Sequence, residues 1–237
     1  MSQFGRFGGG LQMTKVVKDI IIINVIVFVI SYMLPQFIPA FPQTIIDKLA
    51  IYYPSNPAFR PYQIITYMFT HGGYLHIFFN MFALFNFGTL LERVWGPKRF
   101  AFFYLFCGIA ALIVYFGVNA AVAYAQTGSV VLEPSTITTQ TLYDIYAVPC
   151  VGASGAIYGL LAAFAVLFPN TQLIMLFFPV PIKAKYAVPL LIILFDFTVG
   201  VAQFGHSNIG HFAHIGGALF GFLLVLYWNK NNKKTLW

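Results

Sequence analysis

The sequence predicts an all-α integral membrane protein that folds as a bundle of six transmembrane helices. Of its 237 residues, 59% are hydrophobic and only 8% are charged, and the mean hydropathy of +0.80 lies far above that of a water-soluble domain. The apolar residues form runs of roughly 17 to 24 residues, the length that an α-helix needs to cross the hydrocarbon of a bilayer. No alternating pattern typical of barrel strands replaces these runs, so a helical bundle is the expected architecture.

Six apolar segments follow one another along the chain, separated by stretches rich in proline, glycine or charged residues. The predicted spans are 17–34, 75–91, 100–124, 152–168, 186–204 and 211–228. The predicted organisation is a flexible cytoplasmic tail over residues 1–16, one six-helix membrane domain over 17–228 and a basic cytoplasmic tail over 229–237. The first outer connection, 35–71, carries many prolines and aromatic residues and is expected to lie at the level of the lipid headgroups.

The net charge of +7 is explained by membrane topology, and no nucleic-acid partner is expected. Only Lys48 and Arg60 fall on the outer side of the six-span arrangement. The other basic residues fall on the opposite side: Arg6, Lys15, Lys18, Arg93, Lys98, Arg99, Lys183, Lys185, Lys230, Lys233 and Lys234. The positive-inside rule therefore predicts a multi-pass protein of the plasma (inner) membrane with both termini in the cytoplasm.

Four polar residues are expected at one depth near the outer surface of the bilayer. With cytoplasmic termini, the second, fourth and sixth spans run inward, so their first turns lie at the outer end. Their first turns contain His76 and Asn80, Ser154, and His214, each within about 5–10 Å of the helix entrance at 1.5 Å rise per residue. Polar side chains at membrane depth usually face the interior of the bundle or a water-filled cavity.

Small residues on the fourth and sixth spans would allow these helices to approach closely. They are Gly152, Gly155, Gly159 and Ala163 on one, and Gly210, Gly217 and Gly221 on the other. A lone serine in such a setting is most often a packing residue. The placement of Ser154 at the same depth as His214 favours the alternative, a reactive serine.

The residue types suit nucleophilic catalysis. A serine hydroxyl becomes a good nucleophile when an imidazole takes its proton, and the oxyanion that forms needs fixed donors. His76 and Asn80 share a helix face and would supply two donors, and the amide of Ser154 near a helix N-terminus would supply a third. Tyr158 would support the imidazole ring. Because no carboxylate is suitably placed, the expected unit is a Ser154–His214 dyad.

The remaining polar residues have simpler explanations. His71, His206 and His211 are expected at the interface or at a helix start, with hydrogen bonds to loops. Asp196, in the middle of the fifth span, is expected to be neutral or partnered within the bundle, and its role stays open. Cys107 and Cys150 show no metal-ligand spacing, so neither a disulfide, a metal nor a cofactor is expected.

Three motifs resemble the rhomboid family of intramembrane serine proteases. They are HGGYLHIFFN, with His71, His76 and Asn80; Gly152-Ala-Ser-Gly155; and Ala213-His-x-x-Gly217, which occur in this order on the second, fourth and sixth spans. The resemblance implies that Ser154 is the nucleophile and His214 the base. It also implies that His76, Asn80 and the Ser154 amide, beside Gly152, bind the oxyanion and that Tyr158 packs on the base. The family's Trp-Arg pair in the first loop is replaced by Tyr62-Gln63.

By this resemblance, the expected activity is hydrolysis of a peptide bond in or near a transmembrane segment of another membrane protein, with no cofactor. The H-E-x-x-H motif of a metalloprotease is absent, and Gly-Ala-Ser-Gly in a helical span does not fit an α/β-hydrolase elbow. A transporter is disfavoured because the polar residues do not continue across the membrane. The alternative that remains is a non-catalytic relative that binds or escorts membrane proteins.

Overall fold

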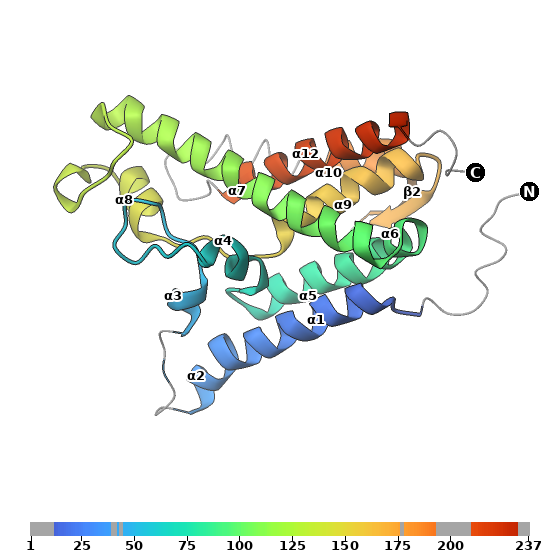
Figure 1. Ribbon diagram of the computed structural model, residues 1–237, viewed down its shortest axis with the longest axis horizontal. Coiled ribbons are helices and arrows are strands. Elements are labelled where there is room, and N and C mark those ends of the chain that lie inside the picture. Colours follow the sequence, from blue (N-terminus) through green and yellow to red (C-terminus); the bar gives the residue numbers. More distant parts are fainter. Residues whose placement is uncertain (1–11, 39–41, 43–44, 176–177, 193–209, 232–237) are drawn as a thin grey trace, which may run out of the picture.

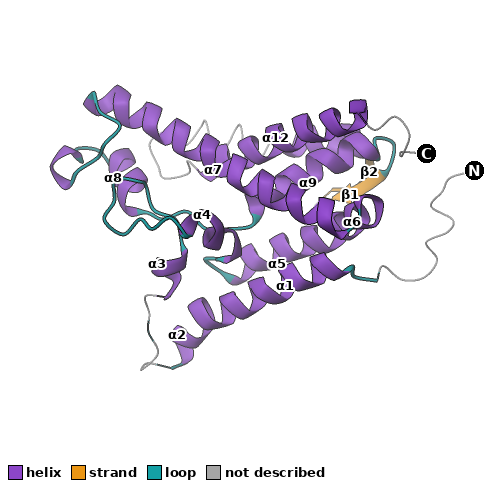
Figure 2. Ribbon diagram, viewed as in Figure 1, coloured by secondary structure: helices purple, strands orange, loops and turns teal. Residues whose placement is uncertain are grey.

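The computed structural model describes residues 12–38, 42, 45–175, 178–192 and 210–231. In this part of the chain the protein is mostly helical (Figure 2). The N-terminal helical stretch comprises α1 (Lys15–Phe28), the π-helical turn η2 (Val29–Met33) and α2 (Leu34–Phe37). The next long stretch comprises α5 (Tyr74–Ala83), the π-helical turn η4 (Leu84–Gly88) and α6 (Thr89–Trp95), and is followed by α7 (Pro97–Thr127).

The C-terminal half contains α9 (Ser154–Leu167), a hairpin of β1 (Gln172–Met175) and β2 (Phe178–Lys183), α10 (Ala184–Leu191) and α12 (Gly210–Asn231). The connections between α2 and α5 and between α7 and α9 contain α3 (Ile45–Leu49), α4 (Gln63–Thr66), the 3-10 turns η3 (Tyr67–Phe69) and η5 (Pro134–Thr136), and α8 (Gln140–Ala147). The two hairpin strands are antiparallel, with Gln172 opposite Lys183.

Four helical stretches of the described chain are long and apolar enough to cross a membrane: Lys15–Phe37, Tyr74–Trp95, Pro97–Thr127 and Gly210–Lys230. They confirm the predicted class, a helical integral membrane protein, with the β1–β2 hairpin as an addition that was not predicted from the sequence. They also contain the first, second, third and sixth predicted spans. The exact number of six spans stays a prediction, because most of the fifth, with Asp196, lies outside the described residues.

The fourth predicted span is shorter than expected. α9 has 14 residues and begins at Ser154, so at 1.5 Å per residue it is about 21 Å long, less than the hydrocarbon thickness. Gly152 and Ala153 precede the helix instead of forming its first turn. Ser154 is therefore the first residue of a helix that begins within the bundle.

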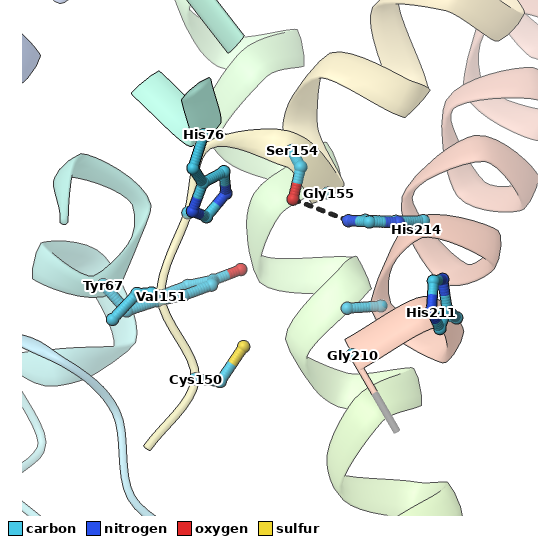
Figure 3. Close-up of a pocket in the computed structure, with 11 residues that line it drawn as sticks. Tyr67, His76, Cys150, Val151, Ser154, Gly155, Gly210, His211 and His214 are labelled. Carbon is cyan, nitrogen blue, oxygen red and sulfur yellow. Dashed lines mark hydrogen bonds between the residues drawn. The ribbon is translucent and has the colours of Figure 1, made fainter. Parts of the chain in front are cut away.

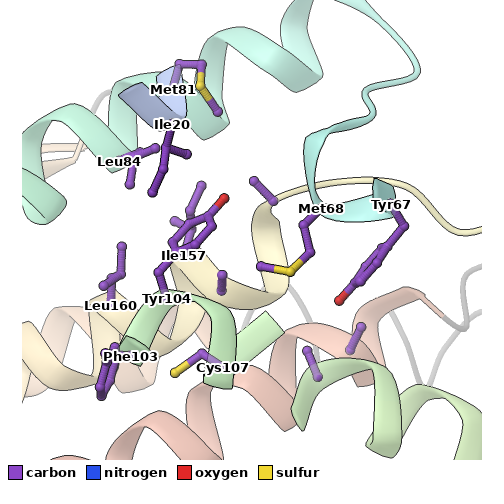
Figure 4. Packing of buried hydrophobic residues seen from close by; sticks show 14 of the residues in the cluster. Ile20, Tyr67, Met68, Met81, Leu84, Phe103, Tyr104, Cys107, Ile157 and Leu160 are labelled. Carbon is purple, nitrogen blue, oxygen red and sulfur yellow. The ribbon is translucent and has the colours of Figure 1, made fainter. Parts of the chain in front are cut away.

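The centre of the bundle is formed by α7, α9 and α12, which lie side by side (Figure 1). Helix α7 contributes Phe103, Tyr104 and Cys107 to the buried core, and α9 contributes Ile157 and Leu160 (Figure 4). On the other side of this core lie α1 and α5. The core fixes α9 against its neighbours, and α9 carries the serine.

A buried carboxylate connects the start of α1 to α6. Glu92 is 4% exposed, and its two oxygens accept hydrogen bonds from the hydroxyl of Thr14 (2.6 Å) and from the amides of Val16 (3.0 Å) and Val17 (2.9 Å). These amides belong to the first turn of α1, where no partner exists within the helix. Glu92 therefore caps α1 from a distant part of the sequence.

The connection between α2 and α5 folds back onto the segment that precedes α9. Ile51 and Cys150 exchange two backbone hydrogen bonds, of 3.0 and 2.8 Å, and the amide of Gly152 donates to the carbonyl of Tyr67 (2.9 Å). Gln63 is buried, and its side chain binds the amide of Arg60 and the carbonyl of Lys48. Gln63 thus anchors the connection between α2 and α5.

Candidate active site

The serine and histidine of the predicted dyad are in direct contact. The Oγ atom of Ser154, the first residue of α9, lies 2.7 Å from Nε2 of His214 in α12 (Figure 3). The distance is that of a strong hydrogen bond. With the proton on the serine, the hydroxyl donates to the imidazole nitrogen, which is the arrangement a general base requires.

Glycines allow α9 and α12 to bring these two side chains together. A Cβ atom added at Gly217 would clash with the carbonyl oxygen of Gly155, and one added at Gly221 would lie 2.6 Å from the Cα of Gly159. The backbones of the two helices are therefore in contact along these positions. This crossing was expected from the small residues of the two spans, and the structure shows it.

The ring of Tyr158 lies flat on that of His214. The ring centroids are 4.4 Å apart and the planes differ by 6°. Tyr158 is four residues after Ser154 and therefore lies one turn further along α9. The stacking restricts the rotation of the imidazole, so the contact anticipated for Tyr158 is present.

Gly152 brings His76 next to the serine. Its φ of 128° is a conformation that side-chain-bearing residues rarely adopt, and a Cβ atom there would lie 2.9 Å from Nε2 of His76 and 3.4 Å from Oγ of Ser154. Only glycine leaves this space open. Asn80 is 6% exposed, and its side-chain amide donates to the carbonyl of His76 (2.8 Å), one turn earlier in α5.

Two hollows meet at Ser154. One is a cavity of about 160 Å³ lined by Tyr67, His76, Cys150, Val151, Gly152, Ser154, Gly155, Gly210, His211, Ala213 and His214 (Figure 3). The other is an apolar groove of about 340 Å³ between α5 and α9, lined by Leu75, His76, Phe79, Asn80, Ala83, Ser154, Ile157, Tyr158 and Leu161. The serine is thus accessible both from a cavity with polar groups and from a groove suited to an apolar chain.

Three residues near the serine were not expected from the sequence. Tyr67, Cys150 and His211 line the cavity, and the ring of His211 lies 5.9 Å from that of His214. His211 is three residues before His214, and this helical spacing is a signal in the sequence that could have placed the two rings near each other. Burial raises the pKa of the Cys150 thiol to about 12, so this thiol stays protonated and is not a competing nucleophile.

His71, expected at the interface with hydrogen bonds to a loop, is more deeply buried in the protein than a residue of an interfacial loop would be. His71 is fully buried, and its ring packs against that of His76 with centroids 4.9 Å apart. Asp196 and His206 lie outside the described residues. Within the residues that the structure describes, no group of three or more His, Cys, Asp or Glu side chains is arranged to hold a metal ion.

The fold and this site define a class: helical membrane proteins in which a serine at a helix start contacts a histidine across a glycine-rich helix crossing. A family model, described as the rhomboid domain, matches residues 58–231, well over half of the chain. The chain therefore belongs to the rhomboid family.

Similar proteins occur in eukaryotes and bacteria. The chain is 29% identical over 171 residues to Rhomboid protein 1, mitochondrial, of Saccharomyces cerevisiae, covering 72% of this chain and 43% of the yeast protein. It is 30% identical over 218 residues to the human presenilin-associated rhomboid-like protein, mitochondrial, covering 90% and 48%. It is 31% identical over 165 residues to the rhomboid relative YdcA of Bacillus subtilis, covering 69% and 65%. The chain thus spans about half the length of the yeast and human relatives.

Proposed function

We propose that this protein is an intramembrane serine endopeptidase that cleaves membrane-protein substrates in or near a transmembrane segment, with Ser154 and His214 as its catalytic dyad. The observation that carries the proposal is the 2.7 Å contact between Ser154 Oγ and His214 Nε2 at the meeting point of a cavity and a groove. Membership of the rhomboid family supports the same activity.

The proposed reaction has two halves. In the first, His214 takes the proton of Ser154 as Oγ attacks the carbonyl carbon of the scissile bond, and the collapse of the tetrahedral intermediate transfers that proton to the leaving amine. In the second, His214 takes a proton from water, whose oxygen attacks the acyl group, and then returns the proton to Ser154. The products are one new amine and one new carboxylic acid.

The oxyanion of each tetrahedral intermediate would be bound by His76, Asn80 and the amide of Ser154. All three belong to residues that line the groove between α5 and α9. The amide of Ser154 is in the first turn of α9, where backbone N–H groups have no intrahelical partner and the helix dipole favours negative charge. Gly152 leaves the space next to the serine that the oxyanion would need.

The groove suggests how a transmembrane substrate would approach. Six of its nine lining residues are apolar or aromatic, among them Leu75, Phe79 and Leu161, so a lipid-embedded segment would not have to leave an apolar environment to reach Ser154. A bond within an intact helix is protected, so we expect substrates with helix-weakening residues near the cleavage site and a small residue just before it.

We propose that the membrane domain comprises residues 17–228 and resides in the plasma (inner) membrane, with both termini in the cytoplasm. The distribution of lysine and arginine supports this orientation. The yeast and human relatives are named as mitochondrial, and the Bacillus relative is bacterial. Reporter fusions after residue 16 and after residue 229, combined with membrane fractionation, test both the orientation and the membrane.

The decisive experiment is cleavage of a tagged single-span substrate in proteoliposomes by the purified protein, in parallel with Ser154→Ala and His214→Ala. We expect cleavage by the parent and none by the two variants, and labelling of Ser154 by a serine-reactive fluorophosphonate in the parent alone. If several helix-weakened substrates stay intact and the parent is not labelled, the non-catalytic binding function replaces this proposal.

A further inference from the structure

His71 is a polar residue in a setting that does not satisfy it. It lies in the short connection between η3 and α5, and its exposed fraction is 0%. Among the atoms of the described residues, neither ring nitrogen makes a hydrogen bond of good geometry, and the backbone of Phe69 offers only a weak polar contact. Burying an unpaired nitrogen destabilises the folded state, so an apolar side chain would suit this position better if packing were the whole of its role.

The contact of His71 points to such a further role. Its ring meets the ring of His76 in an edge-to-face arrangement, with centroids 4.9 Å apart and planes at 67°. On its other side, Nε2 of His76 approaches the space beside Gly152 that faces Ser154. The ring of His76 therefore contacts His71 on one side and faces, on the other, the open space in which an oxyanion would form.

A histidine ring needs such a support to keep one orientation. The torsion that rotates the imidazole about its bond to Cβ has a broad energy minimum, so packing rather than intrinsic preference fixes the direction of the ring nitrogens. Donors to an oxyanion act only when they are oriented in advance. Removing the flat ring behind His76 would allow its imidazole to turn away from Ser154.

His71 is not arranged to act on a substrate itself. It does not line the cavity at Ser154 or the groove between α5 and α9. Burial, and secondarily the neighbouring His76, lowers the pKa of His71 to about 3, so the ring is neutral at neutral pH. It adds no positive charge next to His76 and takes up no second proton in the working range.

We propose that His71 is a positioning residue that holds the imidazole of His76 toward the oxyanion site. This inference rests on the proposed peptidase function. It predicts an effect on the transition state alone, because the oxyanion does not exist in the bound substrate.

The test compares two apolar variants that both keep the buried space occupied. His71→Leu keeps the core filled but removes the flat ring, and His71→Phe keeps a flat ring without nitrogens. We expect His71→Leu to lower kcat about tenfold with KM unchanged, less than the loss of about a hundredfold for removing an oxyanion donor outright. His71→Phe should recover kcat to within about threefold of the parent.

A double-mutant cycle separates positioning from general destabilisation. In a His76→Ala background, the His71→Leu substitution should have no further effect on kcat, because the side chain that it positions is gone. The control is Thr89→Val on α6. It removes a different fully buried polar group, a hydroxyl without a partner in the described chain, and should leave kcat unchanged. Thermal unfolding of each variant verifies that it is folded.

Two results would overturn the inference: a parental kcat for folded His71→Leu, or a loss that is equally large with and without His76. Both are distinguishable from failure of the proposed function. If the protein is not a peptidase, the parent itself would not cleave the substrate, and Ser154→Ala would make no difference.

Discussion

His214 Nε2 lies 2.7 Å from Ser154 Oγ, although the two residues are 60 positions apart in the sequence and belong to different helices. The contact exists because α9 and α12 cross with their backbones touching at Gly155 and Gly217. The geometry of the dyad therefore depends on groups that take no part in the chemistry: a glycine crossing, a stacked tyrosine and the loop that ends at Gly152.

The stacking of Tyr158 on His214 predicts a difference between two substitutions. Tyr158→Phe keeps the ring, with centroids 4.4 Å from the imidazole in the parent, and should retain cleavage within about threefold. Tyr158→Leu removes the flat surface and should lower kcat by about ten- to a hundredfold, because small misplacements of a catalytic group are costly. Equal kcat values for the two variants would show that the hydroxyl or mere bulk, and not the stacked ring, supports His214.

The helix crossing predicts that one methyl group is enough to separate the dyad. In Gly217→Ala the new Cβ would clash with the carbonyl of Gly155, so α12 must move away from α9. We expect a destabilisation of about 1–3 kcal/mol, typical of overpacking, together with loss of fluorophosphonate labelling of Ser154.

Gly117→Ala is the matched control for that substitution. Gly117 is also in a long helix, α7, but no atom lies within 4 Å of its added Cβ. Because alanine favours helix over glycine by about 1 kcal/mol, this variant should be as stable as the parent or more so. Loss of labelling in both variants would mean that the crossing has no special importance.

Much of the fold and of the candidate site could be predicted from sequence because hydrophobic length and motif order are one-dimensional signals. Composition predicted the helical membrane class, and the depths of Ser154 and His214 on separate spans predicted that they would meet. The glycines at 155, 159, 217 and 221 predicted close helices, and the structure has them in contact.

Other features could not be predicted because they depend on how distant segments fold back. His71 reads as a loop residue, since no periodic signal tells that the connection before α5 turns inward and buries it. The apolar run that contains α9 begins at Gly152, yet the φ of 128° at that glycine is incompatible with a helix and delays the start to Ser154. In the sequence, Glu92 reads as the partner of the adjacent Arg93 in an ion pair that fixes a loop, whereas it caps α1 some 75 residues away.

The capping role of Glu92 predicts a large effect on stability from a residue remote from the dyad. Glu92→Ala removes the acceptor for two amides and one hydroxyl, of which the amide of Val17 is buried and the other two groups are partly buried, and this should cost about 1–3 kcal/mol in the free energy of unfolding. Asp19→Ala is the control: it removes an exposed carboxylate from the same helix and should stay within about 0.5 kcal/mol of the parent. Reversible unfolding in mixed detergent micelles measures both, and similar values would refute the cap.

The buried imidazole of His71 predicts how stability depends on pH. Burial lowers its pKa from 6.5 to about 3 in the folded protein, so between these values the unfolded chain binds a proton that the folded protein does not. Stability from this group is complete above about pH 6.5 and decreases as the pH falls toward 3, by up to about 1.4 kcal/mol per pH unit.

Carboxylates titrate in part of this window, so the readout is the difference in unfolding free energy between the parent and His71→Phe. We expect this difference to shift in favour of His71→Phe as the pH falls from 6.5 to 4, because phenylalanine binds no proton. A difference that is independent of pH would mean that His71 is protonated as readily in the folded protein as in the unfolded chain, and would contradict its complete burial.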